Sequence, residues 1–118
     1  MKGNTLAELS RDLSVDIIEL VKHLKMNKGT IISHPIGRSG TSIGANIHGA
    51  QFAQGKKDFI SKLEIALKEA SETGCWIELL HRTKYFDEKA CKMLSSRCAS
   101  LRAMLLAPCK TAKENGRG

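Results

Sequence analysis

The residues that could do chemistry gather in the segment GRSGTSIGAN, which occupies positions 37–46. Its glycines, hydroxyl side chains and one arginine are the kinds of groups that cradle a phosphate. A P-loop, however, requires G-x-x-x-x-G-K-[ST] after a strand. The nearest candidate, GAQFAQGKK, has its first glycine one place too early and Lys57 where the hydroxyl belongs. We therefore expect no nucleotide-binding loop here.

The apolar residues of this segment instead follow the period of a helix. Ile36, Gly40, Ile43, Ile47 and Ala50 are separated by four, three, four and three positions, which places them on one face. Each glycine costs the helix about 1 kcal/mol relative to alanine. Such a helix is stable only when neighbours pack closely against it, so we expect a tightly packed helix and not an open loop.

Three polar side chains, Ser39, Ser42 and Asn46, share one side of that predicted helix at spacings of three and four. They could bind a ligand, and an enzyme that uses this Ser/Asn/Arg group is the least favoured function. Such side chains more often bond to carbonyls of the preceding turn or to a facing helix, which is the interpretation that we favour.

Arg38 lies near the start of the same nearly uncharged helix. It could contact a phosphate or form a salt bridge with another subunit. We favour a salt bridge within the chain, to a carboxylate of the third predicted helix: Asp58, Glu69 or Glu72.

The cysteines and histidines form no recognisable metal or catalytic site. The four cysteines contain no C-x-x-C pair, and no His-x-x-x-His pair accompanies them. Cys91 and Cys98 are seven positions apart in an apolar stripe, and we expect both to be reduced core residues. The histidines share no local spacing, so we expect no metal, no cofactor, no catalytic residue and no enzyme. They are His23, His34, His48 and His81.

Two helices are predicted in the first half of the chain. The sequence TLAE from Thr5 is a capping box that predicts a helix start, and leucine and isoleucine then recur at steps of three and four up to Leu24. Residues 27–34 are expected to connect it to the second helix, with Ser33 or His34 as cap and Pro35 in the first turn.

A long third helix is predicted from Lys57 to Tyr85, after Gly55 as terminator of the second. It carries one core stripe, which includes Phe59, and a second apolar set that either a broader core or a neighbouring subunit must cover; we favour the subunit. That second set comprises Ile65, Trp76, Leu79 and Leu80.

The last helix is predicted to begin at the cap Asp87 and to end at Pro108. Together these elements predict an all-α fold, an antiparallel up-down-up-down four-helix bundle. We expect a single domain over residues 5–109 and a flexible polar tail over residues 110–118.

Positive charge is concentrated at the end of the chain. The 118 residues carry a formal net charge of +7, and residues 82–118 hold nine basic and three acidic side chains. This excess is compatible with binding of nucleic acid or another polyanion, with little sequence specificity and strong salt dependence, and equally with a solvated helix face and a soluble tail. The candidate nucleic-acid-binding residues are Arg82, Lys84, Lys89, Lys92, Arg97, Arg102, Lys110 and Lys113.

The segments RSGTSIGAN, KKDFISKLEIALKEASET and WIELL together resemble the four-helix-bundle proteins encoded in intervening sequences of 23S rRNA. The accessory protein of diversity-generating retroelements is a structural relative of that family. The resemblance implies a bacterial, cytoplasmic, non-enzymatic protein that assembles as a homopentameric ring with a basic surface. The motif positions carried over as structural or interface residues are Arg38, Ser39, Ser42, Asn46, Asp58, Phe59, Glu69, Glu72 and Trp76.

The sequence thus predicts an oligomeric scaffold or accessory protein that binds RNA or DNA, with a reverse transcriptase as a candidate partner. The alternative is a protein-interaction module without nucleic-acid binding. The first ten residues hold no apolar signal core, and no run approaches the about 18 apolar residues of a membrane span. We therefore expect a cytoplasmic protein with no membrane contact.

Overall fold

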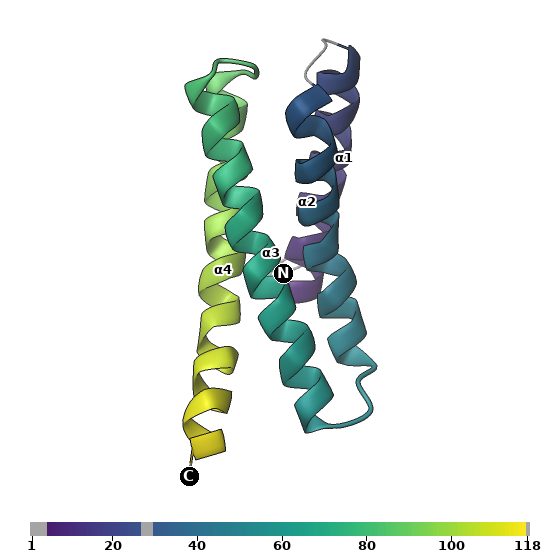
Figure 1. The fold of residues 1–118 in the computed structure, drawn as a ribbon, viewed down its shortest axis with the longest axis vertical. Coiled ribbons are helices and arrows are strands. Elements are labelled where there is room, and N and C mark those ends of the chain that lie inside the picture. The colour runs from purple at the N-terminus through teal and green to yellow at the C-terminus, as the bar shows by residue number, and fades with distance from the viewer. Residues whose placement is uncertain (1–4, 27–29, 118) are drawn as a thin grey trace.

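The computed structural model describes residues 5–26 and 30–117, which form four helices and no strand (Figure 1). Helix α1 spans Leu6–Met26, α2 spans Thr30–Gln51, α3 spans Lys56–Arg82 and α4 spans Glu88–Arg117. The molecule is a rod 50 Å long and 28 by 23 Å across. The prediction of an all-α fold built from four packed helices is confirmed.

Each helix packs against the next in sequence, and α4 also contacts α1, while the diagonal pairs do not meet. Across the α1–α2 contact, Gly37 lies nearest Val21, whereas Gly44 lies nearest Ser14. Because the numbers rise on one helix and fall on the other, these two helices run antiparallel. The α2–α3 and α3–α4 links lie at opposite ends of the rod (Figure 1). The α1–α4 contact is the smallest of the four.

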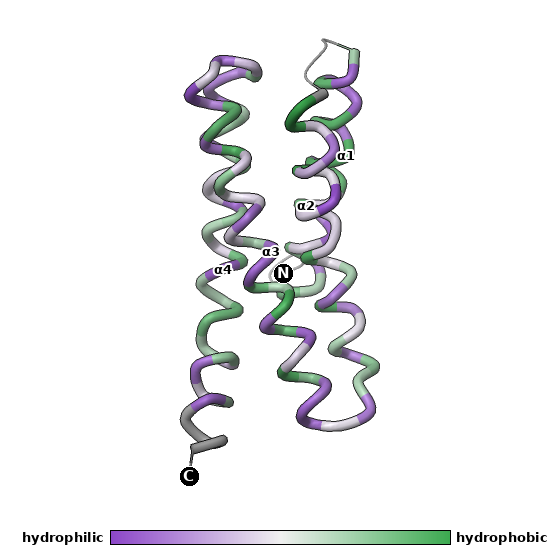
Figure 2. Tube along the Cα trace, viewed as in Figure 1, coloured by the Kyte–Doolittle hydropathy of each residue, from purple (hydrophilic) through white to green (hydrophobic). Residues whose placement is uncertain are grey.

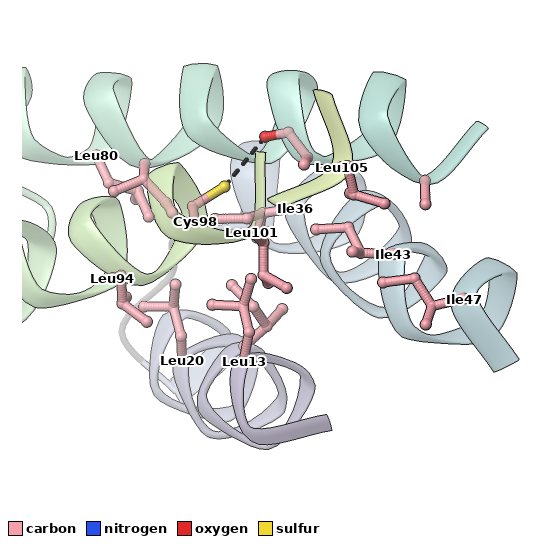
Figure 3. Close-up of a cluster of buried hydrophobic side chains, with 14 of the residues drawn as sticks. Leu13, Leu20, Ile36, Ile43, Ile47, Leu80, Leu94, Cys98, Leu101 and Leu105 are labelled. Atoms are coloured by element: carbon pink, nitrogen blue, oxygen red, sulfur yellow. Dashed lines mark hydrogen bonds between the residues drawn. The ribbon is translucent and has the colours of Figure 1, made fainter. Parts of the chain in front are cut away.

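The core is a single column of aliphatic side chains to which all four helices contribute (Figure 3). Hydrophobic and hydrophilic residues alternate along the helices, as Figure 2 shows for α3 and α4, and the hydrophobic ones turn inward. The seam predicted for α2 is confirmed, since Ile36, Ile43, Ile47 and Ala50 are all buried. Residues buried to 1% exposure or less include Leu13, Ile17, Leu24, Ile77, Leu80, Leu101 and Leu105.

The caps predicted for the first and last helices are confirmed. The Glu8 amide donates to Thr5 Oγ1 over 3.1 Å, and the Thr5 hydroxyl donates to the Glu8 carboxylate over 2.7 Å. At the start of α4, the Ala90 amide donates to Asp87 Oδ2 over 2.9 Å. Both caps satisfy amides that a helix start leaves without an intrahelical partner.

The predicted start of the second helix is wrong. α2 begins at Thr30, so Pro35 lies inside the helix and Ser33 and His34 are not its cap; residues 27–29 of the expected connector lie outside the described part. Ile32 packs against the core and Ser33 is 2% exposed. The free energy gained by burying these side chains offsets the cost of the backbone hydrogen bond that the proline removes.

Two other predicted boundaries are also wrong. Gly55 does not terminate α2, which ends at Gln51; it is the N-cap of α3 and makes no side-chain cap bond. α4 does not end at Pro108 but continues to Arg117. Leu105 and Cys109 on either side of that proline are buried, so packing carries the helix through it. The backbone of residues 110–117 is therefore helical where a polar tail was expected.

Candidate functional site

The segment at positions 37–46 lies wholly within α2, and its glycines face α1. A methyl group added at Gly37 would lie 3.2 Å from Val21 Cγ2, and one added at Gly44 would lie 3.2 Å from Ser14 Oγ. These distances are shorter than ordinary van der Waals contact, so the glycines allow two helices to approach closely. The prediction that this segment is a helix tightly packed against its neighbours is confirmed.

Arg38 joins α2 to α3 through two carboxylates. Its Nη1 and Nη2 donate to Glu69 over 3.1 and 3.2 Å, and Nη2 also donates to Glu72 over 2.7 Å. The hydrogen bond to Glu69, followed by the charge of Glu69, raises the pKa of the Arg38 guanidinium. Of the three predicted partners, the structure selects these two; Asp58 pairs instead with Lys62 over 3.3 Å.

The other polar residues of the segment are bonded within the bundle. Ser42 Oγ donates to the Arg38 carbonyl over 2.6 Å, and Asn46 Nδ2 donates to the Ser42 carbonyl over 2.9 Å. Ser39 is fully buried and lies 2.9 Å from the hydroxyl of Thr73 on α3. These are the backbone and facing-helix bonds that we favoured.

Within residues 5–26 and 31–113, no buried side-chain nitrogen or oxygen lacks a hydrogen-bond partner. Arg38 and Ser39 are bonded to side chains of α3, whereas Ser42 and Asn46 are bonded to carbonyls of α2 itself. In this part of the chain, the Ser/Asn/Arg group leaves no buried polar atom without a partner.

The second apolar set on α3 is only partly at the surface. Ile65 is 39% exposed and Leu79 is 37% exposed, while Trp76 packs partly against the core. Leu80 was assigned to this set wrongly, since it is 1% exposed and belongs to the core. Phe59, expected in the core stripe, is 39% exposed because it lies in the first turn of α3, near the end of the rod. Ile65, Trp76 and Leu79 therefore remain in the second apolar set and form a small apolar face on α3.

The cysteines are free thiols. Cys91, Cys98 and Cys109 are buried in α4, and Cys75 on α3 is exposed, so the prediction for Cys91 and Cys98 as core residues is confirmed. Cys98 Sγ donates to the Ala70 carbonyl over 3.1 Å (Figure 3). Burial raises the pKa of the Cys98 thiol from 9.0 to about 11 and also raises those of Cys91 and Cys109.

Two of the histidines make separate aromatic contacts. His23 meets Phe86 edge-on at 5.1 Å between ring centroids, and His48 lies 5.0 Å from Phe52. No cluster of three or more histidine, cysteine or acidic side chains that could hold a metal occurs in the part of the chain that the structure describes.

A groove of about 540 Å³ between α3 and α4 is the feature that the sequence did not indicate. Small residues of both helices line it, including Gly74 on α3 and Ala99 on α4, and the cations Lys92 and Arg102 lie along its α4 side. Its volume lies within the range of sites that bind small ligands. Residues from two helices distant in sequence create it, so no local motif could reveal it.

All eight predicted nucleic-acid-binding residues are exposed. Arg97 pairs with Asp16 across the α1–α4 contact, and Arg82 and Lys92 pair with glutamates one turn earlier in their own helices, at 3.6 and 3.2 Å. The other five make no ion pair with a described side chain: Lys84, Lys89, Arg102, Lys110 and Lys113.

The fold and these contacts define an all-helical bundle protein with a polar α2–α3 network and a basic α4. The chain matches the family model of the 23S rRNA-intervening sequence protein over residues 2–107 and belongs to that family. It is similar to a protein of unknown function from the S23 ribosomal protein family of Bacteroides thetaiotaomicron VPI-5482, with 41% identity and a TM-score of 0.86. That alignment covers 90% of this chain and 99% of the other.

Among curated proteins, no similar sequence is found. The described helices include none that is long and apolar enough to cross a membrane.

Proposed function

We propose that this chain is a non-enzymatic, oligomeric accessory protein that binds nucleic acid weakly and without sequence specificity. The observation that carries this proposal is the set of exposed cations in the last third of the chain, five of which have no carboxylate partner among the described side chains. Unpaired lysine and arginine side chains release counterions from phosphates at little cost to the fold. Contacts of this kind position a protein on nucleic acid without reading bases.

Oligomerisation would multiply this surface. The apolar face of Ile65, Trp76 and Leu79 supports an interface with another copy, because exposed apolar groups on one side of a helix favour association. The family resemblance supports a homopentameric ring in the cytoplasm, with a reverse transcriptase as a candidate protein partner. Light scattering tests assembly: a particle of 12.9 kDa would contradict it.

A salt titration tests nucleic-acid binding. Fluorescence anisotropy with labelled RNA and DNA, single-stranded and duplex, should detect binding at about 50 mM salt and a loss of one to several decades in affinity at about 200 mM. Absence of binding at low salt, or binding that does not respond to salt, would contradict the proposal.

The second candidate is a protein-interaction module that binds no nucleic acid, which the same apolar face on α3 favours. Under this function, the protein would self-associate or capture a protein partner while oligonucleotides fail to bind. Trp76→Ala would then reduce association, whereas Lys89→Gln in the first turn of α4 would not.

A further inference from the structure

We infer that the groove between α3 and α4 is the place where a single nucleic-acid strand binds, an inference that rests on the proposed function. Two packed helices have axes about 8–10 Å apart, so the groove between them is narrow. An unpaired nucleotide of a single strand can enter such a groove, whereas a duplex keeps its paired bases inside and presents only its backbone. The expected ligand is therefore single-stranded RNA or DNA.

The cations of α4 divide between two sides of the helix. Lys92 and Arg102 line the groove, whereas Arg97 faces α1 and pairs with Asp16. Helical geometry of about 100° per residue places Lys110, eighteen positions after Lys92, on the same side. Lys113 is eleven positions after Arg102, which places it within about 20° of Arg102 around the helix and so on the same side.

These four cations follow one side of α4 over about 30 Å, at about 1.5 Å per residue. A positively charged groove that follows the backbone is the arrangement by which proteins bind single strands without sequence preference. Of the carboxylates on this side, Glu78 pairs with Arg82, and Glu88 pairs with Lys92, where it competes with phosphate. Glu64 of α3 lies close to Cys109, where burial and then the charge of Glu64 raise the pKa of that thiol. Arg102 lines the groove and makes no ion pair with a described side chain.

The floor of the groove is wider than packing requires. A methyl group added at Gly74 would meet nothing nearer than Cys98 Sγ at 3.9 Å. The glycine therefore costs α3 about 1 kcal/mol relative to alanine without being needed for the approach of α4. Because Gly74 has no side chain, the floor of the groove is open at this position by at least the volume of one methyl group.

Cys75 makes this inference directly testable in the unmodified chain. It lines the groove and is exposed, whereas the other three cysteines are buried. Alkylation by iodoacetamide, followed by mass spectrometry, therefore reports on access to the groove. Labelled single strands of about 20 nucleotides should bind by anisotropy and should slow alkylation of Cys75 severalfold, and a duplex of the same length should protect it less.

Arg102→Gln and Arg11→Gln form a matched pair, because each removes one exposed arginine charge, the first from the groove and the second from α1. For four phosphate contacts by a single strand, log affinity should fall against log salt with a slope of about −2.8. Arg102→Gln should reduce the magnitude of that slope by about 0.7, while Arg11→Gln should leave it unchanged. Circular dichroism of both variants checks that the helices are retained.

The outcomes separate the two proposals. Binding without protection of Cys75, equal slopes in the two variants, or stronger protection by duplex would overturn the groove as the strand site and leave the proposed function standing. If no oligonucleotide binds at low salt, the proposed function fails and this inference fails with it.

Discussion

Gly40 of α2 lies so close to Ile17 of α1 that a β-carbon built on the glycine would be 2.8 Å from both Ile17 Cγ1 and Cγ2, and 3.2 Å from Ile17 Cβ. These atoms are the branch of the isoleucine and not the flexible end of a long side chain, so they cannot move aside without moving α1. The close approach explains why this helix tolerates its glycines.

Gly40→Ala should destabilise the protein despite the better helix propensity of alanine. Overpacking costs about 1–3 kcal/mol, and the propensity gain is about 1 kcal/mol, so we expect a net loss of about 1 kcal/mol. Thermal unfolding at one fixed protein concentration measures it.

Gly74→Ala is the matched comparison, and the expected sign is opposite. Space exists for the methyl group beside Cys98, so the variant should gain up to about 1 kcal/mol from helix propensity. If both variants shift the melting temperature in the same direction, the different roles assigned to these two glycines are wrong.

Arg38→Met should lower the melting temperature because it leaves Glu69, whose side chain is only 12% exposed, without its bidentate partner. Arg38→Lys should lie between this variant and the wild type, since lysine keeps the charge but loses the planar fork. The swap Arg38→Glu with Glu69→Arg should recover part of what Arg38→Glu alone loses. Equal melting temperatures of Arg38→Met and the wild type would show that the network does not stabilise the bundle.

Stability should fall with rising pH between about pH 9 and about pH 11 because of Cys98. Burial raises the pKa of the folded thiol to about 11 from 9.0, so in this window the unfolded chain loses the proton while the folded chain keeps it. Deprotonation therefore lowers the free energy of the unfolded state by about 1.4 kcal/mol per pH unit, which amounts to a loss of stability of about 3 kcal/mol across the whole window.

Cys98→Ala provides the control, because lysines and Tyr85 also titrate in alkaline solution. Urea unfolding with a non-thiol reductant, at several pH values, should give a shallower decline for the variant than for the wild type. Parallel curves would refute the contribution of this thiol.

Asp87→Ala should cost about 1 kcal/mol because it removes the side-chain cap of α4. The Ala90 amide, which donates to Asp87 Oδ2 over 2.9 Å, would then have only water as a partner. Asp87→Ser keeps an acceptor at the cap and should retain most of the stability. An alanine variant as stable as the serine variant would mean that this cap contributes little.

The helices and their inward faces could be predicted from the sequence because both are local properties. The apolar spacing in α2 indicated the residues that are buried, and the residue types around Thr5 and Asp87 indicated where helices start. Two of the three carboxylates offered to Arg38 were also correct, since i, i+3 spacing places Glu69 and Glu72 on one side of a helix.

Boundaries that depend on distant contacts could not be predicted. When only local propensity is considered, Pro35 indicates the start of a helix and Pro108 indicates the end of one. Both lie inside helices because buried neighbours such as Ser33 and Cys109 gain more from the bundle than the lost hydrogen bond costs. Gly55, a typical terminator, serves instead to cap the following helix.

By itself, the sequence determined that the chain is helical, which residues of α2 face inward, and that positive charge is concentrated near the end of the chain, because periodicity and composition are carried by neighbouring positions. Only the tertiary structure decided which carboxylates Arg38 binds, which cysteine remains exposed, and that Gly74, Lys92 and Arg102 line one groove. The physical reason is that these relations join atoms of different helices, and their distances are set by how the helices pack.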